Sequence, residues 1–309
     1  MKTVSLRRFA PLASVLLAGV AALALFLFFA TSSAQPEEGD AAADGAGAAP
    51  RDLTFGIVPQ QSASRLAQLW GPLAAHLGEE IGIPVNFVTT KDIPTFEACL
   101  DAGAFDIAYM NPYHYVAFSE RSGYRALAHQ ADKKLHGLIV VREDSDKAGL
   151  EDLDGANIAF PSPAAFGASV LPRAEMTSRG IAFTPAYVRS HDSVYRAVAL
   201  ELNDAGGGVL RTFNAMPSDL RDQLRVIYRT GDYTPHAIAA LPGMSDTMGD
   251  AITRALVATR DDAPDLTDAL GMSGFAAARD GDWDDVRALN ITPEQAGLGA
   301  VDGVICPFD

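Results

Sequence analysis

From residue 53 onward, short apolar runs typical of β-strands alternate with segments that have the three- and four-residue apolar spacing of amphipathic helices. Residues 53–58, 84–89 and 106–110 form the first three expected strands, and residues 62–81 form the first expected helix. Strands that alternate with helices predict a parallel sheet covered by helices on its faces. The fold class is therefore expected to be α/β.

The alternation starts again after a turn at residues 152–155. We expect strands at 158–160, 184–188, 204–210 and 225–230, with helices at 167–178 and 191–202. A length of 309 residues has room for two such units. We therefore expect two lobes, the first built from residues 51–142 and 236–309 and the second from residues 143–235. Ligands of open α/β sheets bind beyond the carboxyl ends of the strands, so the residues just after each strand are the candidate site residues.

The amino terminus has the pattern of an export segment. Lys2, Arg7 and Arg8 precede an uncharged apolar run at residues 9–30, and small residues follow it before Gln35. Residues 1–34 are thus expected to be a cleaved signal peptide, or an uncleaved inner-membrane anchor, because the run is long enough to span a bilayer. A buried core helix is the third alternative. Both leading alternatives place the rest of the chain in the periplasm or another extracytoplasmic space.

Residues 35–50 are rich in Ala and Gly and lack apolar periodicity, which predicts a flexible linker. The 39 acidic residues outnumber the 24 basic residues and give a formal net charge of −15. This balance argues against nucleic acid as a partner and against docking on an anionic membrane. A small anionic ligand remains compatible, because one site can be locally positive in an acidic protein. Cys99 and Cys306 could form a disulfide or remain two free buried thiols, and the sequence leaves both open.

The segment at residues 160–167 gives the strongest physical indication of a binding site. A strand ends there, small residues turn the chain, and a helix begins with free backbone N–H groups. Such a helix start can bind an oxyanion without any Lys or Arg, and Ser162 could add a hydroxyl donor. A plain helix cap is the alternative.

Four other positions follow expected strands. His191 opens a helix and could donate to an anion, although a structural histidine is the alternative. Arg211 could make a bidentate contact with an oxyanion or form an ordinary salt bridge. Gln60 and Gln61 follow the first strand and could add donors, although solvent-facing loop residues are the default.

Tyr109, Met110 and Asn111 follow the third expected strand and belong to an aromatic cluster. An amide beside aromatic rings would suit the apolar part of a small ligand and its orientation, although core packing is expected to explain some of the cluster.

Motifs for catalysis and for metal or cofactor binding are missing from the sequence. It contains no GxSxG or HExxH motif, and the glycine-rich segment at residues 204–211 lacks the spacing of a nucleotide-binding loop. We therefore expect no enzyme activity, no metal and no cofactor. The glycines of that segment are expected to permit close backbone packing against the cleft.

Five segments in order resemble the phosphonate/phosphite/phosphate-binding proteins of ABC transporters. They are FGIVPQQSASRLAQLWGPLAAHLGEEIGIPV, DIAYMNPYHYV, FPSPAAFGASVLP, SHDSVYRAVALELNDAGGGVL and YTPHAIAA, and the resemblance runs from about residue 53 to residue 270. It implies a type II periplasmic-binding fold, with two lobes that close on the ligand about a hinge. It also implies that the backbone amides of Ala164, Ala165 and Phe166 grip the oxyanion together with Ser162, and that His191 is the family's histidine.

Three departures from the family pattern bear on the ligand. Ser162 is all that remains of a serine- and threonine-rich helix start, Ile93 replaces an aromatic residue, and Arg211 stands where a carboxylate would meet an amino group. The resemblance therefore implies phosphate, phosphite or a simple phosphonate in preference to an amine-bearing phosphonate.

We accordingly expect a monomeric solute-binding protein of an ABC importer, with a small oxyanion as ligand and a membrane permease as partner. Tyr109, Met110 and Asn111 would line the lobe opposite the helix start, and Arg211 would be a secondary contact. A membrane-tethered module that uses the same cleft to signal to a partner protein is the main alternative, and an enzyme on this scaffold is a third.

Overall fold

A computed structural model describes residues 51–298 and 305–308. The expected signal peptide or anchor (1–34) and the expected linker (35–50) lie outside these residues. Within the described part of the chain, every helix is too short or too polar to cross a membrane.

Six strands form the first sheet. Their spatial order is β11 (Phe275–Ala277), β4 (Arg125–Gln130), β10 (Ala237–Ala240), β3 (Ile107–Met110), β1 (Leu53–Ile57) and β2 (Val85–Thr89). β1 pairs in parallel with β2 and β3, whereas β10 runs antiparallel to β3 and β4. The carboxyl ends of β1 and β3 and the amino end of β10 therefore share one edge of the sheet.

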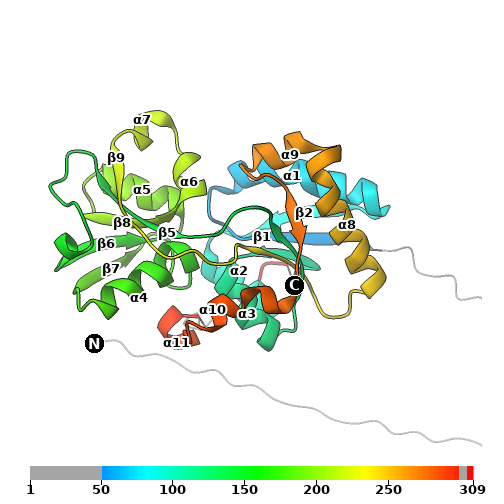
Figure 1. The fold of residues 1–309 in the computed structure, drawn as a ribbon. Coiled ribbons are helices and arrows are strands. Elements are labelled where there is room, and N and C mark those ends of the chain that lie inside the picture. The colour runs from blue at the N-terminus through cyan, green and yellow to red at the C-terminus, as the bar shows by residue number, and fades with distance from the viewer. Residues whose placement is uncertain (1–50, 299–304, 309) are drawn as a thin grey trace, which may run out of the picture. The chain divides into compact units, whose positions relative to one another are not determined.

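Helices cover both faces of the first sheet (Figure 1). One face carries α1 (Ala63–Ile81), α8 (Asp246–Asp262) and α9 (Pro264–Ala269). The other carries α2 (Ile93–Asp101), α3 (Pro112–Arg121) and α10 (Asp284–Arg287), with the short segments η3 (Asp280–Trp283) and α11 (Pro293–Ala296) nearby in the chain.

Helix α1 shows how the sequence specifies these elements. Ser62 caps the helix by accepting a hydrogen bond from the backbone N–H of Arg65 at 3.4 Å, and Gly82 ends it in the left-handed region with φ 71°. The residues between them bury one apolar stripe against the sheet: Leu66, Leu69, Trp70, Leu73, Ala74 and Leu77. The helix expected at residues 62–81 is therefore confirmed.

Five strands form the second sheet. Their order is β7 (Phe183–Tyr187), β6 (Ala156–Phe160), β8 (Ala205–Val209), β5 (Gly137–Arg142) and β9 (Leu224–Arg229). One face carries α5 (His191–Ala199), α6 (Leu210–Asn214) and α7 (Ser218–Arg221). The other carries the π-helix η2 (Phe166–Val170), which continues into α4 (Leu171–Ser178), while η1 (Glu151–Leu153) precedes β6.

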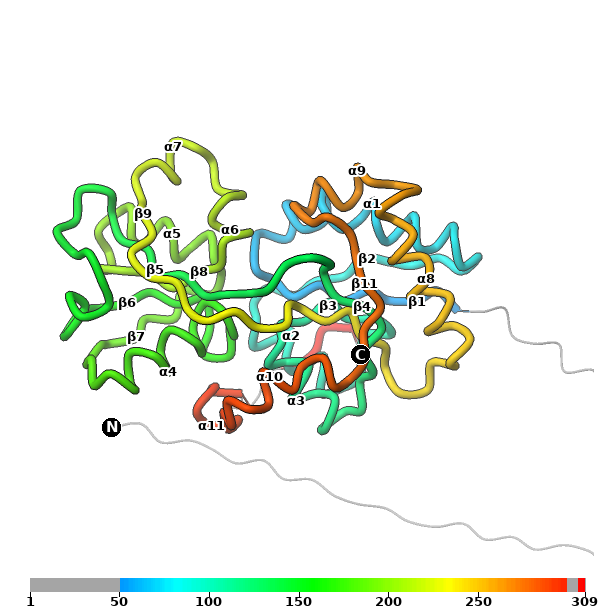
Figure 2. The backbone as a smooth tube through the Cα atoms, viewed as in Figure 1, coloured from blue at the N-terminus to red at the C-terminus, as the bar shows by residue number. Residues whose placement is uncertain are grey.

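Two extended segments connect the sheets and run side by side (Figure 2). One leads from β4 to β5 and the other from β9 to β10, and an antiparallel bridge joins Leu135 to Tyr233. From the sequence, the first lobe is expected to end at residue 142 and so to include residues 137–142. β5 instead pairs with β8 on one side and β9 on the other, so residues 137–142 belong to the second sheet. We propose a lobe boundary between Gln130 and Gly137.

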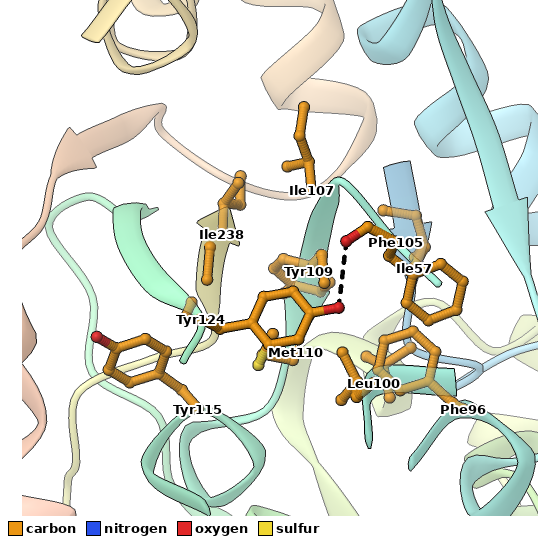
Figure 3. Packing of buried hydrophobic residues seen from close by; sticks show 14 of the residues in the cluster. Ile57, Phe96, Leu100, Phe105, Ile107, Tyr109, Met110, Tyr115, Tyr124 and Ile238 are labelled. Atoms are coloured by element: carbon orange, nitrogen blue, oxygen red, sulfur yellow. Dashed lines mark hydrogen bonds between the residues drawn. The ribbon is translucent and has the colours of Figure 1, made fainter. Parts of the chain in front are cut away.

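The core of the first lobe is built on the central strands of its sheet (Figure 3). Phe96 stacks on Phe105 with ring centroids 5.1 Å apart, and the hydroxyl of Tyr124 donates to the Phe105 carbonyl at 3.1 Å. A Cβ at Gly56 of β1 would overlap the Phe105 ring, so glycine is required for this packing.

A disulfide links Cys99 of α2 to Cys306, which is also buried. The sequence left the pairing open, and the structure decides it in favour of the bridge. The ring of Phe308 lies 5.9 Å from that of Phe105, so the segment after Cys306 packs beside the core of the first lobe.

Candidate functional site

The carboxyl edges of the two sheets enclose a small cavity. The first lobe supplies residues that follow β1, β2 and β3 or precede β10, and the second lobe supplies the start of η2, the start of α5 and the end of β8. The residues that line it are Val58, Gln60, Ile93, Asn111, Ala165, Phe166, Gly167, Ala168, His191, Val209 and His236.

Direct hydrogen bonds join the lobes around this cavity. The Asn111 side-chain amide donates from Nδ2 to the Ala164 carbonyl at 3.0 Å, while its Oδ1 accepts from the His114 backbone N–H at 2.8 Å and so caps α3. The backbone N–H of His191 donates to the Gln60 carbonyl at 3.1 Å. The described conformation is therefore one in which the lobes are in contact.

The helix start η2 presents unused donors to the cavity. Among the described residues, the backbone N–H groups of Phe166, Gly167 and Ala168 have no hydrogen-bond acceptor, and all three residues line the cavity. The Ala165 N–H is already engaged, because it donates to the Ser162 carbonyl at 3.3 Å. Free N–H groups at a helix start carry partial positive charge and favour an anion.

Glycines in two strands let η2 approach the sheet this closely. A Cβ at Gly207 of β8 would overlap the Ala168 carbonyl oxygen, and a Cβ at Gly137 of β5 would overlap that of Gly167. The close backbone packing expected for the glycine-rich segment at residues 204–211 is thus confirmed.

His191 is fully buried in a network of hydroxyl groups. Its Nδ1 lies 3.1 Å from Thr212 Oγ1, which in turn lies 2.8 Å from the Tyr195 hydroxyl. Burial, with a smaller contribution from the charge of Arg211, lowers the pKa of His191 to about 3. The ring is therefore neutral at physiological pH.

His236 is a second buried histidine on the cavity wall. Its ring stacks on that of Tyr109, with centroids 5.0 Å apart and planes 17° apart, and its Nε2 lies 3.1 Å from Gln60 Nε2. Burial lowers the pKa of His236 well below its ordinary value, and the nearby charge of Arg211 adds to the shift. A neutral His236 can accept the Gln60 hydrogen bond at Nε2.

Arg211 stands beside the cavity and not in its wall. Its guanidinium donates to Gln60 Oε1 and lies 5.7 Å from the centroid of the Tyr109 ring. No carboxylate of the described residues pairs with it. Arg211 and Tyr109 both line a larger groove that adjoins the cavity at Val209 and His236.

The structure distributes the residues expected from sequence over three environments. Asn111, Ala165, Phe166 and His191 line the cavity, together with Ile93. Tyr109 and Arg211 line the adjoining groove. The other three residues do not line the cavity. Met110 is buried in the core, and the Ala164 carbonyl accepts the hydrogen bond from Asn111. Ser162 is buried, and its hydroxyl has no hydrogen-bond partner among the described residues.

The sequence does not identify His236, Gly167 or Ala168 as site residues, and it indicates Gln60 only as an additional hydrogen-bond donor. His236 precedes an antiparallel strand, so it reaches the ligand edge from the opposite chain direction. A search limited to residues after strands cannot find it. Knowledge of the strand order in the sheet would be needed to predict that His236 lies at the ligand edge.

Residues 55–283 match the family model described as the periplasmic substrate-binding protein of the phosphonate ABC transporter. The chain is also 25% identical over 176 residues to the phosphate-import protein PhnD of Mycolicibacterium smegmatis, an alignment that covers 51% of this chain and 54% of that protein. The chain thus spans about half the length of this curated relative.

Two solved structures share the fold. The binding-protein component of an ABC phosphonate transporter from Pseudomonas aeruginosa superposes with a TM-score of 0.72 at 16% identity, over 82% of this chain and 90% of that one. PhnD1 from Prochlorococcus marinus, solved in complex with methylphosphonate, gives a TM-score of 0.72 at 14% identity, over 81% of this chain and 100% of that one. The expected two-lobed α/β fold of periplasmic-binding proteins is confirmed.

Proposed function

Because the chain belongs to the family of periplasmic substrate-binding proteins of phosphonate ABC transporters, we propose that it captures a small phosphorus oxyanion in the cavity between its lobes. The family consists of binding components of transporters, so the chain is a binding protein and not an enzyme. Phosphate, phosphite and a simple phosphonate are the proposed ligands.

The observation that carries this proposal is the set of three unused N–H groups at Phe166, Gly167 and Ala168 on the wall of a small cavity. We assign the oxyanion grip to these amides in preference to those of Ala164 and Ala165, because the Ala165 N–H already has an acceptor. The cavity is small, with room for about one water molecule in the described conformation, so it favours a small anion over a bulky ligand.

Neutral histidines complete the proposed grip. The Thr212 hydroxyl has two acceptors within reach, Nδ1 of His191 at 3.1 Å and the Val209 carbonyl at 3.0 Å. We propose that it donates to Nδ1 when the ligand is bound, which places the ring proton on Nε2 and makes it available to the oxyanion. Asn111 lines the opposing lobe, and its contact with the Ala164 carbonyl joins that lobe to the loop before η2. Arg211 adds positive potential from the edge of the cavity.

Family membership supports an extracytoplasmic location and delivery of the ligand to a membrane permease. Closure of the lobes would shield the oxyanion from water and present a surface to the permease that differs from that of the open protein. We further propose that the protein acts as a monomer.

Calorimetric titration with phosphate, phosphite, methylphosphonate and sulfate tests this function. We expect at least one phosphorus oxyanion to bind, and His191→Ala to weaken that binding by about tenfold or more, since a hydrogen bond to a charged group is lost. His76→Ala, on α1 and outside the cavity wall, is the matched control. Failure of all four anions to bind would refute the oxyanion assignment.

The apolar run at residues 9–30 favours a second candidate, a membrane-tethered sensor that uses the same cleft. Mass spectrometry of the amino terminus separates the two candidates. A chain that starts at Gln35 supports the released binding protein, and an intact Met1 in the membrane fraction supports the sensor.

A further inference from the structure

A groove of about 330 Å³ adjoins the oxyanion cavity and shares Val209 and His236 with it. Both lobes line this groove. Its basic residues come from three elements: Arg65 from α1, Lys133 and Lys134 from the segment between β4 and β5, and Arg211 from α6.

The charge of the groove is opposite to that of the protein. Four basic side chains line it against a single carboxylate, Asp268, although the chain carries a formal net charge of −15. Within residues 51–298 and 305–308, Arg65, Lys133 and Arg211 form no ion pair. Lys134 lies 3.7 Å from Asp285 and donates to Thr234 at 3.0 Å, so its charge is partly balanced. A concave surface of one sign concentrates ions of the other sign.

Arg211 marks the junction between the cavity and the groove. It contacts Gln60 of the cavity wall and the Tyr109 ring, and it is only half exposed. A partly buried guanidinium without a carboxylate leaves its charge uncompensated, which an anionic ligand group at the junction would correct.

We propose that the groove is a second subsite, and that, besides phosphate, phosphite and simple phosphonates, the protein binds organic phosphonates or phosphate monoesters that carry a second anionic group. The inference rests on the proposed function, since it places the phosphorus oxyanion in the cavity against η2. The substituent then passes His236 and Val209, and its terminal anion meets Arg211, Arg65 and Lys133. The same cations disfavour an amine-bearing substituent.

A pair of ligands of matched shape tests the proposal. Phosphonoacetate carries a carboxylate where phosphonoacetamide carries a neutral amide. We expect phosphonoacetate to bind about five- to tenfold more tightly in calorimetry at low ionic strength, and the difference to shrink at about 0.5 M salt, because the basic groups are exposed to solvent.

Two matched double variants test whether the groove residues cause the preference for phosphonoacetate. Arg65→Gln/Lys133→Gln should remove most of the preference for phosphonoacetate and leave the affinity for phosphonoacetamide within about twofold. Lys91→Gln/Arg254→Gln removes the same two charge types from exposed positions outside the groove and should preserve the preference.

Equal affinity for the two ligands, or equal loss of preference in both double variants, would overturn the second subsite. If methylphosphonate and both test ligands all fail to bind, the proposed oxyanion function fails instead. The two failures are therefore distinguishable.

Discussion

Gln60 Nε2 lies 3.1 Å from Nε2 of His236, while Oε1 of the same amide accepts from Arg211. The contact with Arg211 fixes which end of the amide faces the histidine, so Gln60 donates and His236 accepts. The neutral side chain of Gln60 thus links Arg211, which lines the groove, to the neutral ring of His236 on the cavity wall. The backbone carbonyl of Gln60 also accepts from His191, which belongs to the other lobe.

Replacement of Gln60 should therefore weaken ligand binding more than the loss of one neutral amide suggests. We expect Gln60→Ala to lower methylphosphonate affinity by about tenfold, because both Arg211 and His236 lose their partner. Calorimetry provides the measurement. Gln223→Ala, at an exposed position in the second lobe, should bind as the wild type does, and an unchanged affinity in Gln60→Ala would contradict the network.

Folding stability should fall as the pH falls below about 6.5. Burial lowers the pKa of His191 to about 3 and that of His236 well below its ordinary value, so the unfolded chain takes up protons that the folded protein excludes. Each ring should contribute about 1.4 kcal/mol of lost stability per pH unit between its unfolded and folded pKa.

Urea denaturation between about pH 7.5 and pH 5.5 measures this slope above the range in which carboxylates titrate. His236→Gln should reduce the slope by about one proton, whereas His76→Gln, outside the cavity wall, should not. A slope in His236→Gln equal to that of the wild type would show that His236 is not buried as a neutral ring.

Anion binding should be coupled to proton uptake. A negative oxyanion beside His191 opposes the effects that lower its pKa, namely burial and the charge of Arg211. Titration with methylphosphonate in buffers of different ionisation enthalpy measures the protons exchanged, and we expect the contribution of His191 to be positive near pH 5 and to vanish near pH 7, where the ring stays neutral. His191→Asn should take up fewer protons than the wild type; identical uptake would assign the effect to another group.

Gly207→Ala should impair both stability and binding, because its Cβ overlaps the Ala168 carbonyl oxygen and pushes η2 away from the sheet. We expect a loss of about 1–3 kcal/mol in the free energy of unfolding and weaker oxyanion binding. Gly71→Ala is the control: its Cβ would face open space in α1, where alanine is the better helix former. A fully stable Gly207→Ala protein with wild-type affinity would mean that η2 tolerates displacement.

Removal of the disulfide should destabilise the first lobe. We expect Cys99→Ala/Cys306→Ala to lower the free energy of unfolding by about 2–5 kcal/mol, because the bridge closes a long loop in the unfolded chain. Denaturation with and without reductant provides the measurement. The double variant should not respond to reductant, and a wild type that is equally indifferent would indicate free thiols.

Most of the fold could be predicted because its strands are apolar and its helices periodic, as in α1 and in the strands at residues 53–58 and 106–110. Two strands of the first sheet are not predicted from the sequence. β4 carries Arg, His and Gln, and β11 has only three residues, so neither has an apolar run that stands out. Their place in the sheet is set by packing against α8 and not by local preference.

The candidate site was predictable where a residue directly follows a parallel strand, as Asn111 and His191 do. It was less predictable at η2, because the unused amides begin at Phe166, after the turn that looked like the helix start. His236 depends on the antiparallel insertion of β10, which no local pattern reveals.

The bridge between Cys99 and Cys306 imposes an order of events on maturation. Cys306 follows the entire second sheet in the chain, so the thiol of Cys99 has no partner until the strands of both lobes have been synthesised. The native bridge therefore cannot form before nearly the whole chain has been made. In an oxidising compartment, a lobe that buries Cys99 early protects it from pairing with a thiol of another molecule while the rest of the chain arrives.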